Sequence, residues 1–166
     1  MELYVLRHAI ALTAAEAGVS QDAERPLSDE GREKMKAIAG AMKKIAVEVD
    51  LVLSSPFVRA RETAILAHDR MSKESCLEFS TALASGQDSK HILEELKQRF
   101  QKTQRITIVG HEPDLSILIG RITSLGRLRL EMKKAALAKI EITELRPEIK
   151  GDLEWLLPPK VMLQIQ

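Results

Sequence analysis

Short apolar runs alternate along this chain with longer stretches in which apolar residues recur every three or four positions. Three such runs, rich in Leu, Val and Ile, lie in residues 3–6, 50–54 and 105–109. Continuous apolar runs of about four to eight residues are typical of strands that are buried on both faces of a parallel sheet. We therefore predict three buried strands in these ranges.

Stretches of helical period follow these runs, and their apolar residues would share one face of a helix. We expect helices that begin just after Ser28, after Pro56, near Ser89 and at Pro113. Ser28 is a suitable N-cap, and the acidic residues at positions 29 and 30 favour the positive end of a helix. Proline suits the first helical position, as expected for Pro113. The helix after Pro56 is expected to end near His68.

The C-terminal part has a different pattern. Residues 138–145 alternate between apolar and polar, and residues 153–157 can pair with them across a turn marked by Pro147 and Gly151. No helix separates these two strands, so we expect them to be antiparallel, at the edge of the sheet. Residues 76–79 are expected to form another short edge strand.

Strands that alternate with helices predict a three-layer α/β/α sandwich with a mainly parallel central sheet and an antiparallel edge strand. The chain has 166 residues and contains no internal repeat, low-complexity tract or linker. This length suits one hydrophobic core, so residues 1–166 are expected to form a single domain.

Composition narrows the function classes. The 25 basic and 24 acidic residues nearly balance, unlike the strongly basic domains that bind nucleic acid. No uncharged segment has membrane-spanning length, and no signal peptide is recognisable. The single cysteine, Cys76, excludes an internal disulfide and is expected to be a small apolar filler. We expect a cytoplasmic monomer whose partners include neither nucleic acid nor a membrane.

Polar residues stand at the carboxyl end of each predicted buried strand: Arg7 and His8 after the first, Ser54, Ser55 and Arg59 after the second, Gly110 and His111 after the third. The carboxyl ends of parallel strands converge on one crevice, so two histidines and two arginines are expected to meet there. No carboxylate accompanies them at these strand ends, which predicts an anionic ligand. Phosphate or sulfate fits best, because the planar arginine fork matches such oxyanions and helix N-termini add free amide groups.

With these residues in view, the sequence resembles the histidine phosphatase superfamily, which includes phosphoglycerate mutases and histidine acid phosphatases. Three segments carry the resemblance: Leu-Arg-His at 6–8, Ser-Pro-Phe-Val-Arg-Ala-Arg-Glu-Thr at 55–63 and Gly-His-Glu-Pro at 110–113. Residues 25–31 and 114–116 add a closer likeness to the small SixA-type phosphohistidine phosphatases. The likeness covers nearly the whole chain in order, and its segments are specific only in combination.

The resemblance implies a phosphoglycerate mutase-like fold and a phosphatase that uses neither a metal nor a cofactor. It implies that neutral His8 attacks phosphorus and forms a phosphohistidine intermediate, which water then hydrolyses. Arg7 and Arg59 would hold the non-bridging oxygens. His111, either protonated or donating from one nitrogen, would stabilise the charge of the transferring group. Arg25 is a further candidate for contact with the same anion.

One departure from the larger members bears on the substrate. In the mutases a carboxylic acid protonates the leaving alkoxide, and the corresponding stretch here, residues 79–86, contains no carboxylate. A positioned acid contributes about 10²–10⁴-fold to such a rate. Imidazole leaves with less help than an alkoxide, so the departure favours an N–P substrate. Glu16, Asp22 and Glu112 stay open as alternative acids.

The chain is also too short for the insertions with which metabolite phosphatases close over small substrates. We therefore predict a phosphohistidine phosphatase in signal transduction. Its partner would be a phosphorylated protein, either a histidine phosphotransfer domain or a phosphotransferase-system carrier. The alternatives are a small-molecule phosphomonoesterase or mutase with the same nucleophile, and a catalytically inactive phosphate-binding module.

A basic cluster follows the last predicted helix: Arg121, Arg127, Arg129, Lys133 and Lys134. Such a cluster is either a solvated surface or a docking site for an acidic partner, whose encounter rate complementary charge would raise.

Overall fold

Six strands form one sheet in the structure, a computed structural model that describes residues 1–71 and 74–165. The strands are β1 (Glu2–Arg7), β2 (Leu51–Ser54), β3 (Cys76–Phe79), β4 (Arg105–Gly110), β5 (Leu137–Glu144) and β6 (Lys150–Leu157). Their order across the sheet is β3–β2–β4–β1–β5–β6. The first four in sequence run parallel, and β5 and β6 are antiparallel at one edge. The predicted mainly parallel sheet with an antiparallel edge is confirmed.

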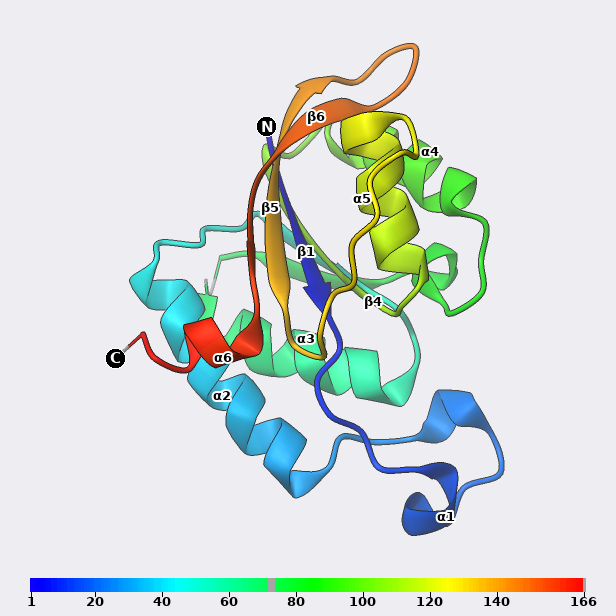
Figure 1. Cartoon of the computed structure of the whole chain (residues 1–166), viewed down its shortest axis with the longest axis vertical. Helices are drawn as coiled ribbons and strands as arrows, with labels where there is room; N and C mark the ends of the chain where they lie inside the picture. The colour runs from blue at the N-terminus through cyan, green and yellow to red at the C-terminus, as the bar shows by residue number, and fades with distance from the viewer. Residues whose placement is uncertain (72–73, 166) are drawn as a thin grey trace.

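Helices cover both faces of this sheet (Figure 1). They are α1 (Ala14–Ala17), α2 (Asp29–Lys44), α3 (Val58–Met71), α4 (Ser89–Arg99), α5 (Asp114–Ser124) and α6 (Pro159–Met162), with short 3-10 turns η1 (Asp22–Glu24) and η2 (Thr81–Leu83). Residues of α2, α3 and α6 share one buried apolar cluster, and residues of α4 and α5 share the other. The predicted three-layer sandwich is therefore confirmed.

Strand β1 shows why its apolar run is continuous. Leu3 and Val5 pack into the cluster with α4 and α5, whereas Tyr4 and Leu6 pack into the cluster with α2 and α3. Successive side chains of a strand point to opposite faces, so a strand covered on both sides needs apolar residues at every position.

Several local predictions are confirmed or corrected. The Ser28 hydroxyl caps α2 by accepting from the Gly31 amide. The prediction that Pro113 is the first helical residue is wrong by one position, because α5 begins at Asp114 and Pro113 is its N-cap. Gly151 lies within β6, paired with Ile142 of β5, rather than in the turn. The position needs glycine, because a Cβ there would lie 2.5 Å from the Glu141 carbonyl oxygen. Cys76 is exposed on edge strand β3 and fills no core position.

Within the described ranges, no helix is both long enough and apolar enough to cross a membrane.

Gly31 lies in the first turn of α2, against the segment that follows His8. A Cβ at Gly31 would lie 2.0 Å from the Ile10 carbonyl oxygen, which also accepts from the Ser28 amide. Overpacking of this kind costs about 1–3 kcal/mol, so Gly31→Ala should lower the free energy of unfolding by that amount in urea titrations. Gly40 in the same helix has no atom within 4 Å of its Cβ position. The control Gly40→Ala should therefore raise the free energy of unfolding by about 0.5–1 kcal/mol. Equal changes in the free energy of unfolding of the two variants would contradict the packing argument.

Candidate active site

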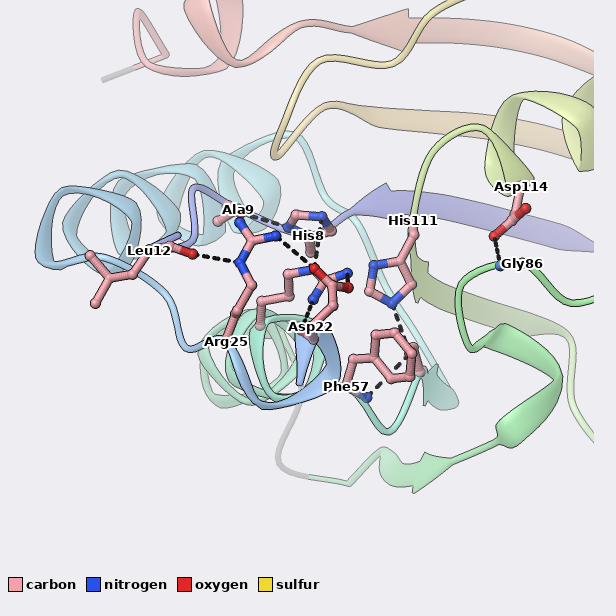
Figure 2. Close-up of polar contacts among 11 residues, drawn as sticks. His8, Ala9, Leu12, Asp22, Arg25, Phe57, Gly86, His111 and Asp114 are labelled. Carbon is pink, nitrogen blue, oxygen red and sulfur yellow. Dashed lines mark hydrogen bonds and ion pairs between the residues drawn. The ribbon is translucent and has the colours of Figure 1, made fainter. Parts of the chain in front are cut away.

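The site lies at the carboxyl ends of β1, β4 and β2. His8 directly follows β1, and its amide donates to the Gly110 carbonyl at 3.0 Å. His111 directly follows β4, and the Ser55 amide after β2 donates to the Val109 carbonyl at 2.9 Å. Arg59 is in the first turn of α3. The predicted convergence of the three strand ends is present, and Figure 2 shows the side chains of His8, Asp22 and His111 gathered in one place.

The two ring nitrogens of His8 have different partners. Its Nδ1 lies 2.7 Å from the Ala9 carbonyl oxygen, which can only accept, so Nδ1 carries the proton. The lone pair of Nε2 then accepts from the Arg59 Nε at 3.3 Å. Burial, together with the charges of Arg59 and Arg7, lowers the pKa of His8 from 6.5 to about 4, against the hydrogen bond to Ala9. At neutral pH the ring is a neutral base with Nε2 available.

His111 stands beside His8 with 5.1 Å between the ring centroids. Its Nε2 lies 2.8 Å from the Ser55 hydroxyl oxygen, and the ring of Phe57 packs against it. Burial, together with His8 and Arg59, lowers the pKa of His111 to about 3. Of the two forms that the sequence left open, the environment favours the neutral ring that donates from one nitrogen.

Arg59 is buried, and an aspartate on η1 holds it. Its Nη1 donates to the Asp22 carbonyl at 2.6 Å, and its Nη2 donates to Asp22 Oδ2 at 2.8 Å. The other carboxylate oxygen accepts from Arg25 Nη1 at 2.7 Å. The Asp22 carboxylate therefore bridges two arginines and places a negative charge beside His8. Hydrogen bonds from Arg25 and then Arg59 lower the pKa of Asp22, so it is ionised.

Sequence reasoning named Asp22 only as a possible acid and missed this bridging role. The available signal was its position three residues before Arg25. The structure brings Arg25 to the site only through Asp22, because Arg25 Nε donates to the Leu12 carbonyl at 2.7 Å.

Arg7 reaches the same region from the end of β1. Its Nη1 donates to the Met132 carbonyl at 2.5 Å, and its charge lowers the pKa of both site histidines. Arg7 Nε and His111 Nδ1 are buried without a hydrogen-bond partner among the described residues. Buried polar nitrogens are nearly always satisfied, so two such atoms around His8 fit a site for an anion.

The three carboxylates left open as proton donors differ in position. Glu16 caps α1, where Oε2 accepts from the Thr13 amide and hydroxyl at 2.8 Å. Glu112 follows His111, accepts from the Ser116 hydroxyl at 2.6 Å, and has its pKa raised by burial. Asp22 contacts Arg59 but is ionised. The three have no hydrogen bond to His8.

The stretch 79–86 lies near His111, where Ala82 and Leu83 line a small hollow together with that ring. Its apolar residues therefore stand next to the site where the larger relatives were expected to carry an acid. Across residues 1–71 and 74–165, no three His, Cys, Asp or Glu side chains are grouped so that they can hold a metal ion.

Comparison with known proteins supports the same reading. A sequence profile of the histidine phosphatase superfamily (branch 1) matches residues 3–84. An uncharacterized protein of Picosynechococcus sp. is 29% identical over 95% of this chain and 100% of its own length. The phosphohistidine phosphatase SixA of Escherichia coli is 24% identical over 96% of this chain and 94% of its own.

Solved structures show the same fold. The protein histidine phosphatase SixA complexed with tungstate superposes with a TM-score of 0.85 and 23% identity, over 96% of this chain and 98% of its own. A putative alpha-ribazole-5'-P phosphatase of Escherichia coli superposes with a TM-score of 0.73 and 19% identity, over 96% and 97%. With its profile match and its SixA-like fold, the chain belongs to the histidine phosphatase superfamily and is a phosphatase of the kind that uses a histidine nucleophile.

Proposed function

We propose that this protein is a phosphohistidine phosphatase that acts on a histidine-phosphorylated protein, with His8 as nucleophile. The observation that carries the proposal is the state of His8. Its Nδ1 proton is held by the Ala9 carbonyl, its Nε2 lone pair points at the Arg59 guanidinium, and burial and the nearby arginines lower its pKa to about 4. A neutral nitrogen base beside arginine donors is what attack on a phosphoryl group requires.

In the first step His8 Nε2 forms a bond to phosphorus while the P–N bond of the substrate breaks. The substrate imidazole leaves with the electron pair and takes a proton from solvent. In the second step water attacks the phosphorus of phospho-His8, the enzyme P–N bond breaks, and the water proton passes to solvent. Arg7 and the unpartnered His111 Nδ1 hold the phosphoryl oxygens through both steps, because these donors match the charge there. Arg59 joins them when it exchanges its Asp22 contacts for the substrate.

Asp22 is the competing anion in this scheme. An incoming phosphoryl group takes the guanidinium donors of Arg59 and, with them, the partners of the Asp22 carboxylate. Arg25 contributes by retaining Asp22 when Arg59 turns to the substrate.

The choice of an N–P substrate rests on the proton donors. Asp22 is ionised, and Glu16 serves as a helix cap, so neither favours protonation of an alkoxide. Imidazole leaves more easily than an alkoxide. A site in which Asp22 and Glu16 do not supply a proton therefore suits an N–P substrate better than a phosphate ester. The name of the Escherichia coli relative, phosphohistidine phosphatase, agrees with this choice.

A small-molecule phosphomonoesterase is the second candidate, and Glu112 is the observation in its favour. Burial raises the pKa of Glu112, and Glu112 Oε1 has no hydrogen-bond partner within the described ranges. A carboxyl with a raised pKa, one residue from His111, is a candidate acid for an alkoxide. The structural neighbours include phosphatases named for small phosphate esters.

One preparation assayed on three substrates separates the two candidates. We expect kcat/KM to be at least about 100-fold higher for a phosphohistidine protein than for sugar phosphates, because a positioned acid is worth about that much to an alkoxide. An aryl phosphate, whose leaving group is also good, should be hydrolysed without such an acid. Efficient turnover of sugar phosphates, together with inactivity on the phosphohistidine protein, would favour the second candidate.

A further inference from the structure

A groove of about 740 Å³ begins at Arg7 and Ala9, directly beside the proposed phosphate site. Its floor is apolar and is formed by Ile10, Ile38 of α2 and Pro159 of α6. Leu163, just after α6, also lines it and is partly exposed. Figure 1 shows α6 lying against α2, which places the two helices that line this groove side by side.

The rim of the groove is cationic. Lys34, Lys133, Lys134 and Lys160 line it together with Arg7, against a single carboxylate, Glu131. Lys34 pairs with Glu30 and Lys133 pairs with Glu131. Among the described residues, Lys134 and Lys160 have no carboxylate partner. The charge of Lys134 is the smallest of the effects that lower the pKa of His8, and a pKa of about 4 leaves the His8 ring neutral at pH 7.

The basic cluster of the sequence is thus divided by the fold. Lys133 and Lys134 belong to this groove, whereas Arg121 and Arg129 line a separate hollow beside Glu112. The lysines that join the groove from α2 and α6 were not part of the sequence cluster.

We propose that this groove receives an acidic amphipathic helix of the protein that carries the phosphohistidine, a proposal that rests on the proposed function. The apolar floor fits the apolar stripe of such a helix, and the unpaired lysines fit carboxylates that flank the stripe. Arg7 both lines the groove and stands next to His8. A helix seated in the groove therefore holds its phosphohistidine beside Nε2 of His8.

The test reverses the two unpaired charges. The probes are a histidine phosphotransfer domain with acidic helices, phosphorylated by phosphoramidate, and free phosphohistidine. For Lys134→Glu/Lys160→Glu, kcat/KM should fall at least about 10-fold on the phosphorylated domain and change less than about twofold on free phosphohistidine. The matched control Lys43→Glu/Lys44→Glu makes the same change in net charge at the far end of α2, on exposed residues. It should change either value less than about twofold.

Each other outcome has a defined meaning. An equal loss on both probes shows that the lysines act on the site itself, and an equal loss in the control shows a general charge effect; both overturn the docking proposal. Wild-type protein that cleaves free phosphohistidine at least as well as the phosphorylated domain also overturns it, while N–P cleavage stands. Wild-type protein inactive on both probes but active on sugar phosphates overturns the proposed function instead.

Discussion

Replacement of His8 by asparagine should abolish turnover and leave the fold intact. The Asn side chain offers no ring nitrogen to attack phosphorus, so the covalent route is closed. Loss of a nucleophile from a site of this kind is expected to lower kcat by at least about 10³-fold. The measurement is steady-state hydrolysis of an aryl phosphate, combined with trapping of labelled phosphoenzyme in an alkaline denaturing quench. Wild type should accumulate a base-stable, acid-labile label, and His8→Asn none.

His91 provides the matched control for this change, because it is an exposed histidine on α4 outside the site. His91→Asn should retain wild-type activity and labelling. Label that persists in His8→Asn would assign the nucleophile to another residue.

His8 also determines the acid limb of the pH–rate profile, where kcat/KM falls as the pH is lowered. The reactive form of His8 is neutral, and kcat/KM reports the pKa values of the free enzyme. With a pKa of about 4 for His8 and about 3 for His111, kcat/KM should stay level from neutral pH down to about pH 5 and fall steeply below pH 4. A histidine with its ordinary pKa of 6.5 would place that limb more than two pH units higher.

Removal of the Arg59 side chain should produce the second large effect. Arg59→Ala takes away the guanidinium that faces His8 Nε2 and leaves the Asp22 carboxylate with one arginine partner. Loss of a preorganised donor to a transferring group typically costs about 10²–10³-fold in kcat, so kcat/KM should fall by that amount. Arg59→Lys should recover only part of it, because an ammonium lacks the paired donors of a guanidinium.

Arg61 is the control for Arg59, two residues further along α3. Its guanidinium lies over the Phe79 ring at 5.1 Å, on the exposed surface, and Arg61→Ala should leave kcat/KM within about twofold of wild type. The free energy of unfolding of all three variants should be measured in urea. A loss of activity in Arg59→Ala that simply follows a loss of folded protein would contradict a role for Arg59 in the reaction.

Local rules explain why much of the fold was predictable. Leu3, Val5 and Leu6 are fully buried, and a run of this kind has few alternatives to a strand covered on both faces. Ser28 caps its helix through a hydrogen bond made three residues away. The convergence of His8, Arg59 and His111 followed from a general property of parallel sheets, which gather the carboxyl ends of their strands.

Other features depended on contacts between distant segments. Gly151 resembles a turn residue locally, but it pairs with Ile142 in the β5–β6 ladder, where the close approach of the Glu141 carbonyl leaves no room for a side chain. Cys76 resembles a core filler, but an edge strand leaves it exposed. Glu62 lies on α3, but its partners are on other segments: it accepts from the Leu27 amide at 2.7 Å and pairs with Arg32 of α2.

By itself, the sequence determined the layers of this protein and the three strand ends that carry its chemistry, because hydrophobic periodicity and strand polarity act over short distances. Only the tertiary structure decided which nitrogen of His8 carries the proton and that Asp22 bridges Arg25 and Arg59. It also decided that lysines from three segments surround one apolar groove. Proton placement and ion pairing depend on which groups lie a few ångströms apart, and the packing of segments far apart in sequence determines those distances.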